Sequence, residues 1–121
     1  MRRSLLVLST ALSIAGGLAA TAGASPAKPN IVHLTAPVSG LRYDQKVVHA
    51  RAGRIKIVFL NRSALKHNVN VESGETELGH SAIVTHGTTS FFVTLKTGKY
   101  NFYCSVPGHE DAGMHGTLVV S

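Results

Sequence analysis

The chain between Tyr100 and Gly116 reads YNFYCSVPGHEDAGMHG and holds the only cysteine in the sequence, together with the only methionine other than the initiator. His109 lies between them, so Cys104, His109 and Met114 follow one another at intervals of five residues. A thiolate, an imidazole and a thioether are ligands that suit copper, whereas magnesium and calcium prefer carboxylates. A second histidine would complete the ligand set of a blue-copper site.

The local pattern explains how this spacing could build one site. Residues 100–104 alternate as a strand does, with Phe102 and Cys104 on one face and Tyr103 on the other. Pro107 and Gly108 then predict a turn, and residues 117–120 predict the next strand. One loop between two strands could therefore point three side chains at a single centre, and a bound metal would hold that loop in place.

The solitary cysteine leaves four interpretations open: a buried inert thiol, an intermolecular disulfide partner, a catalytic nucleophile or a metal ligand. A buried thiol does not explain why a histidine and a methionine follow at fixed distances. A cysteine hydrolase would need an orienting Asn or Asp and an oxyanion hole as well as the histidine. We favour copper over these alternatives. Zinc could use the same ligands, but it has no redox chemistry.

The segment YNFYCSVPGH, followed by GMHGTLVV, resembles the copper loop of cupredoxins, the plastocyanin/azurin family. The family's fourth ligand is an upstream histidine commonly followed by asparagine, and His67-Asn68 matches that pattern. The similarity runs from about residue 54 to residue 121 and is weaker from residue 30. It implies one type 1 copper ion, cycling between Cu(II) and Cu(I), with the ligands His67, Cys104, His109 and Met114.

The resemblance also implies roles for neighbouring residues. Asn68 should bridge the two ligand-bearing segments through hydrogen bonds near Cys104 and Ser105. Electrons should leave through His109, which would be ringed by a small apolar patch where a redox protein docks briefly, and Tyr103 resembles an electron-path tyrosine. His115 should point away from the site, although it would be the obvious substitute if Met114 were not a ligand.

These features predict a one-electron carrier. Four protein ligands leave no open position for a substrate, so we do not expect an enzyme. The alternative function is a copper-handling protein that stores or delivers the metal without redox cycling. It predicts a site that is open to solvent. The donor, the acceptor and the redox potential are not encoded in any motif of the sequence.

The N-terminal residues predict a signal peptide over residues 1–24. Arg2-Arg3 precedes an apolar run from Leu5 to about Ala20, and residues 22–24 (AGA) offer a cleavage site. Cleavage near Ala24 would release residues 25–121 as one domain into the periplasm or the medium. An uncleaved anchor is the less favoured alternative, and the twin arginines leave Tat export open beside Sec export.

The charge of residues 25–121 is moderate. Without Arg2 and Arg3, ten Lys and Arg stand against six Asp and Glu, a net charge of +4. The basic residues are spread along the chain, which indicates a solvated surface and not a nucleic-acid footprint. We expect a monomer that is steered toward acidic redox partners, with weak association with anionic membrane surfaces as a further use of this charge.

The rest of the chain predicts an all-β fold. Seven stretches alternate like strands between turn signals: 31–36, 46–50, 54–61, 68–72, 89–95, 99–104 and 117–120. Such a series indicates an antiparallel β-sandwich, and the resemblance implies the Greek-key, cupredoxin-like form. Residues 73–86 could hide a short helix. His80 and His86 lie in this region and leave a second metal site open.

Overall fold

The computed structural model describes residues 16–17 and 28–121, so the predicted signal peptide lies almost wholly outside the described residues. Residues 28–121 form eight strands. Their bounds are β1 Ile31–Ala36, β2 Val47–Ala50, β3 Gly53–Asn61, β4 Asn70–Ser73, β5 Thr76–His80, β6 Gly87–Leu95, β7 Gly98–Tyr103 and β8 His115–Val120. Among the described residues, no helix is long and apolar enough to cross a membrane.

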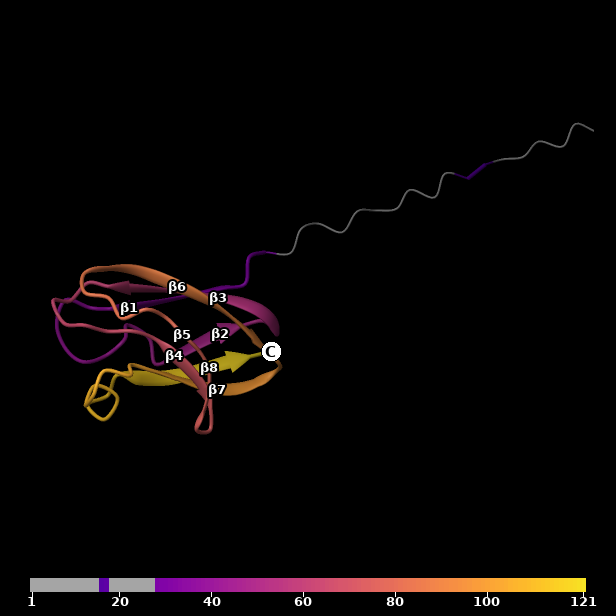
Figure 1. Ribbon diagram of the computed structural model, residues 1–121. Helices are drawn as coiled ribbons and strands as arrows, with labels where there is room; N and C mark the ends of the chain where they lie inside the picture. The colour runs from indigo at the N-terminus through magenta and orange to yellow at the C-terminus, as the bar shows by residue number, and fades with distance from the viewer. Residues whose placement is uncertain (1–15, 18–27) are drawn as a thin grey trace, which may run out of the picture.

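The strands form two sheets, and the predicted all-β sandwich is confirmed. One sheet has the order β1-β3-β6 and the other the order β2-β8-β7-β4-β5. Figure 1 shows β1, β3 and β6 along the upper side of the domain and β7 and β8 along the lower side. The sequence predicts seven strands, and all seven stretches match observed strands to within two residues at each end; the additional strand is β5.

Two of the strand pairs are parallel, which differs from a purely antiparallel sandwich. β1 pairs with β3 and β2 pairs with β8 in parallel, and the remaining pairs are antiparallel. The reason is the path of the chain. After β1 the chain crosses to the other sheet to form β2, and it then returns to form β3 beside β1. A crossover of this kind is what parallel pairing requires.

The short helix suggested within residues 73–86 is wrong, because residues 76–80 form β5. The chain turns at Gly74, whose φ of +59° suits glycine, and β5 returns antiparallel to β4. Four of the five β5 residues are exposed, and the fifth, Gly79, is half-buried. Without a buried face, the strand carries no alternation of apolar and polar residues that the sequence could reveal.

The core lies between the two sheets, and alternate residues of β1, β3 and β8 are buried in it. From β3 it receives Ile55, Ile57 and Phe59, none more than 1% exposed, and from the other sheet Phe102 and Leu118, each 1% exposed. Burying aliphatic and aromatic side chains from both inner faces is what stabilises a sandwich. The alternation that the sequence shows in β3 is therefore the alternation between core and solvent.

Gly116 is the position where the core leaves least room. It lies opposite Phe102 in the β7–β8 pair. A Cβ atom at this position would fall 2.3 Å from the Phe102 ring and 2.6 Å from the carbonyl oxygen of Lys46. Glycine is therefore required here so that the Phe102 ring can lie across β8. This position is the second residue of β8, directly after the loop that carries the candidate ligands.

We predict that Gly116→Ala lowers the free energy of unfolding by about 2 kcal/mol or more, because a buried ring and a backbone carbonyl must both move. Denaturant titration of the metal-free protein measures the change. Gly87→Ala is the control, since no atom lies within 4 Å of a Cβ at that position. Equal effects of the two substitutions would contradict the packing argument.

Candidate metal centre

The candidate ligands lie at one end of the sandwich. Figure 1 shows the loop between β7 and β8 at the end of the domain opposite the C-terminus. Cys104 directly follows β7, Met114 directly precedes β8, and His109 lies in the turns between them. His67 comes from the connection between β3 and β4, where it pairs with Val84 through backbone hydrogen bonds of 3.1 and 2.9 Å.

Three donor atoms converge at this end. The Nδ1 atoms of His67 and His109 lie 3.1 Å apart, and the Cys104 Sγ lies 3.9 Å from the first and 3.6 Å from the second. A point equidistant from the three atoms is about 2 Å from each, close to the usual length of a bond from a transition metal to nitrogen. Within residues 16–17 and 28–121, this is the one group of three such side chains close enough to share a metal ion.

The environment of these atoms fits a metal better than a hydrogen-bonded cluster. His67 is 0% exposed and Cys104 is 1% exposed. Burial lowers the pKa of His67, and the neighbouring His109 lowers it further, so the ring is neutral near pH 7 and offers a lone pair. Its Nε2 atom is buried without a hydrogen-bond partner. The ring is thus held by backbone and packing, with Nδ1 aimed at the other two donors.

Met114 closes the loop around these donors. It is 0% exposed, its carbonyl oxygen accepts a hydrogen bond from the Cys104 amide at 3.1 Å, and its amide donates to the His109 carbonyl at 3.0 Å. These bonds tie the methionine backbone to both of its neighbours in the predicted set. The side chain of His115, the next residue, is exposed.

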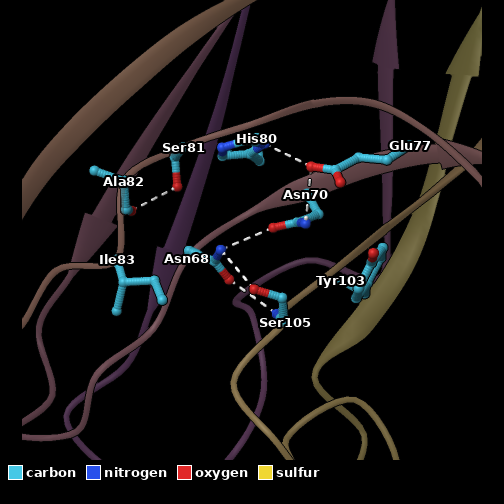
Figure 2. A pocket seen from close by; sticks show the side chains of 9 residues that line it. All are labelled: Asn68, Asn70, Glu77, His80, Ser81, Ala82, Ile83, Tyr103 and Ser105. Atoms are coloured by element: carbon cyan, nitrogen blue, oxygen red, sulfur yellow. Dashed lines mark hydrogen bonds and ion pairs between the residues drawn. The ribbon is translucent and has the colours of Figure 1, made fainter.

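The Asn68 side chain connects the two segments that carry His67 and Cys104. Its oxygen accepts from the Ser105 amide at 2.9 Å, and its Nδ2 donates to the Ser105 hydroxyl and to the Asn70 oxygen, both at 2.8 Å. Figure 2 shows these bonds along the wall of a surface pocket. Both Nδ2 hydrogens and the oxygen of this buried amide are hydrogen-bonded, so the peptides after both ligands are fixed relative to one another.

The same network accounts for His80. Asn70 donates to Glu77 at 3.3 Å, and the Nδ1 atom of His80 lies 2.5 Å from the same carboxylate oxygen (Figure 2). His80 therefore pairs with Glu77, and in the described part of the chain neither His80 nor His86 joins two further ligating side chains. Tyr103 is half-buried and lines the same pocket, where burial raises its pKa.

Tyr43 is the residue that sequence reasoning missed. It is 3% exposed, its hydroxyl donates to the carbonyl oxygen of Asn68 at 2.5 Å, and its ring meets those of Phe59 and Phe102 edge-on at 5.9 and 5.3 Å. Burial raises the pKa of Tyr43, and the negative charges of Cys104 and Glu110 raise it further. The hydroxyl thus remains a donor at neutral pH. No alternation or motif surrounds Tyr43 that could have revealed this contact.

We predict that Tyr43→Phe lowers the free energy of unfolding by about 1–2 kcal/mol, because the buried Asn68 carbonyl loses its hydroxyl donor. It should also speed the release of bound metal, since the peptide next to His67 is held less firmly. Tyr100→Phe is the matched control: its hydroxyl also donates to a backbone carbonyl, that of Lys96, but at an exposed site. Chelator competition and denaturant titration on both variants test this, and equal losses would contradict it.

Comparison with known proteins places this site in a family. The model of the copper-binding proteins of the plastocyanin/azurin family matches residues 31–121. A search of the curated proteins finds no relative by sequence.

Several solved structures share the fold. Reduced auracyanin from Roseiflexus castenholzii superposes with a TM-score of 0.72 at 21% identity, covering 78% of this chain and 99% of that one. Auracyanin A from Chloroflexus aurantiacus, a blue copper protein, gives 0.69 at 22% identity, covering 78% and 100%. Rusticyanin from Thiobacillus ferrooxidans gives 0.64 at 16% identity, covering 78% and 79%. At these identities, the superpositions establish the fold alone.

Proposed function

The chain belongs to the plastocyanin/azurin family of copper-binding proteins, and we propose that it carries single electrons between redox proteins outside the cytoplasm through one type 1 copper ion. The observation that supports this most directly is the convergence of two imidazole nitrogens and one cysteine sulfur within 3.9 Å of one another in a buried site. This combination of donors is typical of blue-copper sites.

We propose His67, Cys104 and His109 as the three strong ligands and Met114 as the weak axial ligand. A bound copper ion would supply the one-electron Cu(II)/Cu(I) couple. The chain's own contribution is to hold the donors in place before the metal arrives. Asn68, Ser105 and Tyr43 do this through the hydrogen bonds described above, which lie around the ligands as orienting contacts do in other metal sites.

The burial of the site favours a carrier over the alternative of copper handling. His67, Cys104 and Met114 are each no more than 1% exposed, and the loop backbone is closed by its own hydrogen bonds. Storage or delivery would need a route by which the metal exchanges readily. An enzyme would need an open coordination position, and four protein donors leave none.

His109 is the proposed exit for the electron, because it is the one half-buried member of the cluster while the other two are buried. Three exposed apolar side chains lie at the same end of the sandwich. Val38, Leu65 and Ile83 are exposed by 67%, 51% and 52% and lie in the connections at this end of the sandwich. A partner protein would dock here briefly, beside the acidic pair Glu110-Asp111. Tyr103, on the flank, is the proposed second path.

The proposed protein is a monomer of residues 25–121, released into the periplasm or the medium when residues 1–24 are removed. Its moderate net charge, with basic residues spread along the sequence, speaks against a nucleic-acid partner. Its donor and its acceptor are redox proteins that dock in turn at the end of the sandwich that carries His109. A weak redox encounter needs only a small interface of this kind.

We predict that the copper-loaded, oxidised protein absorbs strongly in the visible range and that Cys104→Ser removes this band. The thiolate is the proposed source of the charge-transfer absorption, and a hydroxyl cannot replace it. An optical spectrum of each protein after addition of Cu(II) gives the result. A copper-loaded wild type without colour would refute the proposed function.

We predict that Met114→Leu retains the copper and the colour but raises the reduction potential, because the loss of a weak sulfur donor destabilises Cu(II) more than Cu(I). Voltammetry of the wild type and the variant measures the shift. An unchanged potential and an unchanged spectrum would show that Met114 is not an axial ligand.

A further inference from the structure

Charge is divided unevenly between the two sheets. The six acidic residues lie in the β1–β2 connection, in the β4–β5 hairpin and in the loop between β7 and β8: Asp44, Glu72, Glu75, Glu77, Glu110 and Asp111. The strands β1, β3 and β6 contain no acid, and their charged residues are Arg54 and Lys56. Arg62 and Lys96 directly follow β3 and β6 and add to the positive charge.

The outer face of this three-stranded sheet combines these cations with exposed apolar side chains. Ile31, Lys56 and Phe92 lie side by side across its three strands, since Ile31 pairs with Lys56 and Lys56 with Phe92. Phe92 is 52% exposed, Ile31 40% and Leu60 39%. We call the set Ile31, Arg54, Lys56, Leu60 and Phe92 the basic face.

The Phe92 ring lies beside the positive charges of Arg54 and Lys56. The Arg54 guanidinium lies over the ring at 3.8 Å from its centroid, and the Lys56 ammonium lies 5.9 Å from it. The cation–π contact holds a large apolar ring beside two positive charges on the surface. The Phe92 ring remains half-exposed despite these contacts.

We propose that the basic face binds the surface of an anionic lipid bilayer. Cations close to the surface are attracted by anionic headgroups, and an adjacent ring and aliphatic side chains enter the boundary between headgroups and acyl chains. A single sheet face suits a planar bilayer, and isolated apolar residues among cations fit a lipid interface better than the acidic patch of a protein. Asp44, the acid nearest to this sheet, accepts a hydrogen bond from the Thr35 amide. Thr35 lies at one end of β1, whereas Arg54 lies beside the opposite end of that strand.

This orientation would leave the copper-binding end free. The strands run between that end and the end with the C-terminus, so a molecule resting on the face of β1, β3 and β6 lies on its side (Figure 1). His109 would then face along the bilayer, toward partners held in or on the same membrane. The binding itself does not depend on copper, so its failure and a failure of the proposed function can be told apart.

The experiment measures partitioning of the exported protein, with its N-terminus established by mass spectrometry, onto vesicles of phosphatidylcholine with 0% or about 30% phosphatidylglycerol, at low salt and at about 1 M salt. Sedimentation of the vesicles gives the bound fraction. We expect binding to the anionic vesicles alone, lost at high salt and equal for the metal-free and copper-loaded forms.

Variants then locate the surface. Arg54→Gln with Lys56→Gln should weaken partitioning about 30-fold, the effect of removing two cations near a membrane surface. Phe92→Ser should weaken it several-fold at unchanged charge. The matched control is Arg42→Gln with Lys99→Gln, two exposed cations outside this sheet, which should change partitioning less than threefold.

Three outcomes would overturn the proposal: no binding of the wild type to anionic vesicles, equal losses in the two double variants, or binding that Phe92→Ser leaves unchanged. The first outcome, combined with salt-sensitive binding to an acidic protein, would assign the basic face to a protein partner. Denaturant titration of each variant in its metal-free form verifies that the fold is intact.

Discussion

The hydrogen bonds between Asn68 and Ser105 are the constraint on which the site depends, because they join two segments 37 residues apart in the sequence. One segment presents an imidazole and the other a cysteine sulfur. The pairing of β4 with β7 brings the two segments together, and the Asn68 bridge fixes them relative to one another beyond the ends of those strands. Burying three donor atoms that face one another is unfavourable unless the surrounding chain over-determines their positions. The side-chain hydrogen bonds of Asn68 and Tyr43 and the backbone hydrogen bonds of Met114 fix those positions.

This constraint bears on how the protein can transfer electrons. When donors are held by contacts outside the ligand set, a change of metal charge need not move them, and little rearrangement accompanies the arrival of an electron. The two sheets also help to hold the donors in place, since Phe59 from one sheet and Phe102 from the other pack against the Tyr43 ring. The Tyr43 ring therefore links the core between the sheets to the copper-binding end.

Much of this could be predicted from the sequence, for physical reasons that differ from residue to residue. The alternation of Ile55, Ile57 and Phe59 revealed β3, since one face of that strand is buried. The sulfur and imidazole side chains around Cys104 revealed the metal chemistry, because few other functions need them together. β5 escaped notice because it buries neither face, and Tyr43 because its partner is a backbone carbonyl 25 residues away, which no local pattern encodes. The parallel pairs depend on the crossing of the chain between sheets, which is likewise invisible locally.

The position of β8 has a consequence for biosynthesis. This C-terminal strand lies between β2 and β7 within its sheet, and not at an edge. β2 lies at the edge of this sheet, and β8 is its one neighbour there, so β2 has no partner in the sheet until β8 has been synthesised. The five-stranded sheet therefore cannot be completed, nor the loop that carries Cys104, His109 and Met114 closed between β7 and β8, before the last of these eight strands has been synthesised.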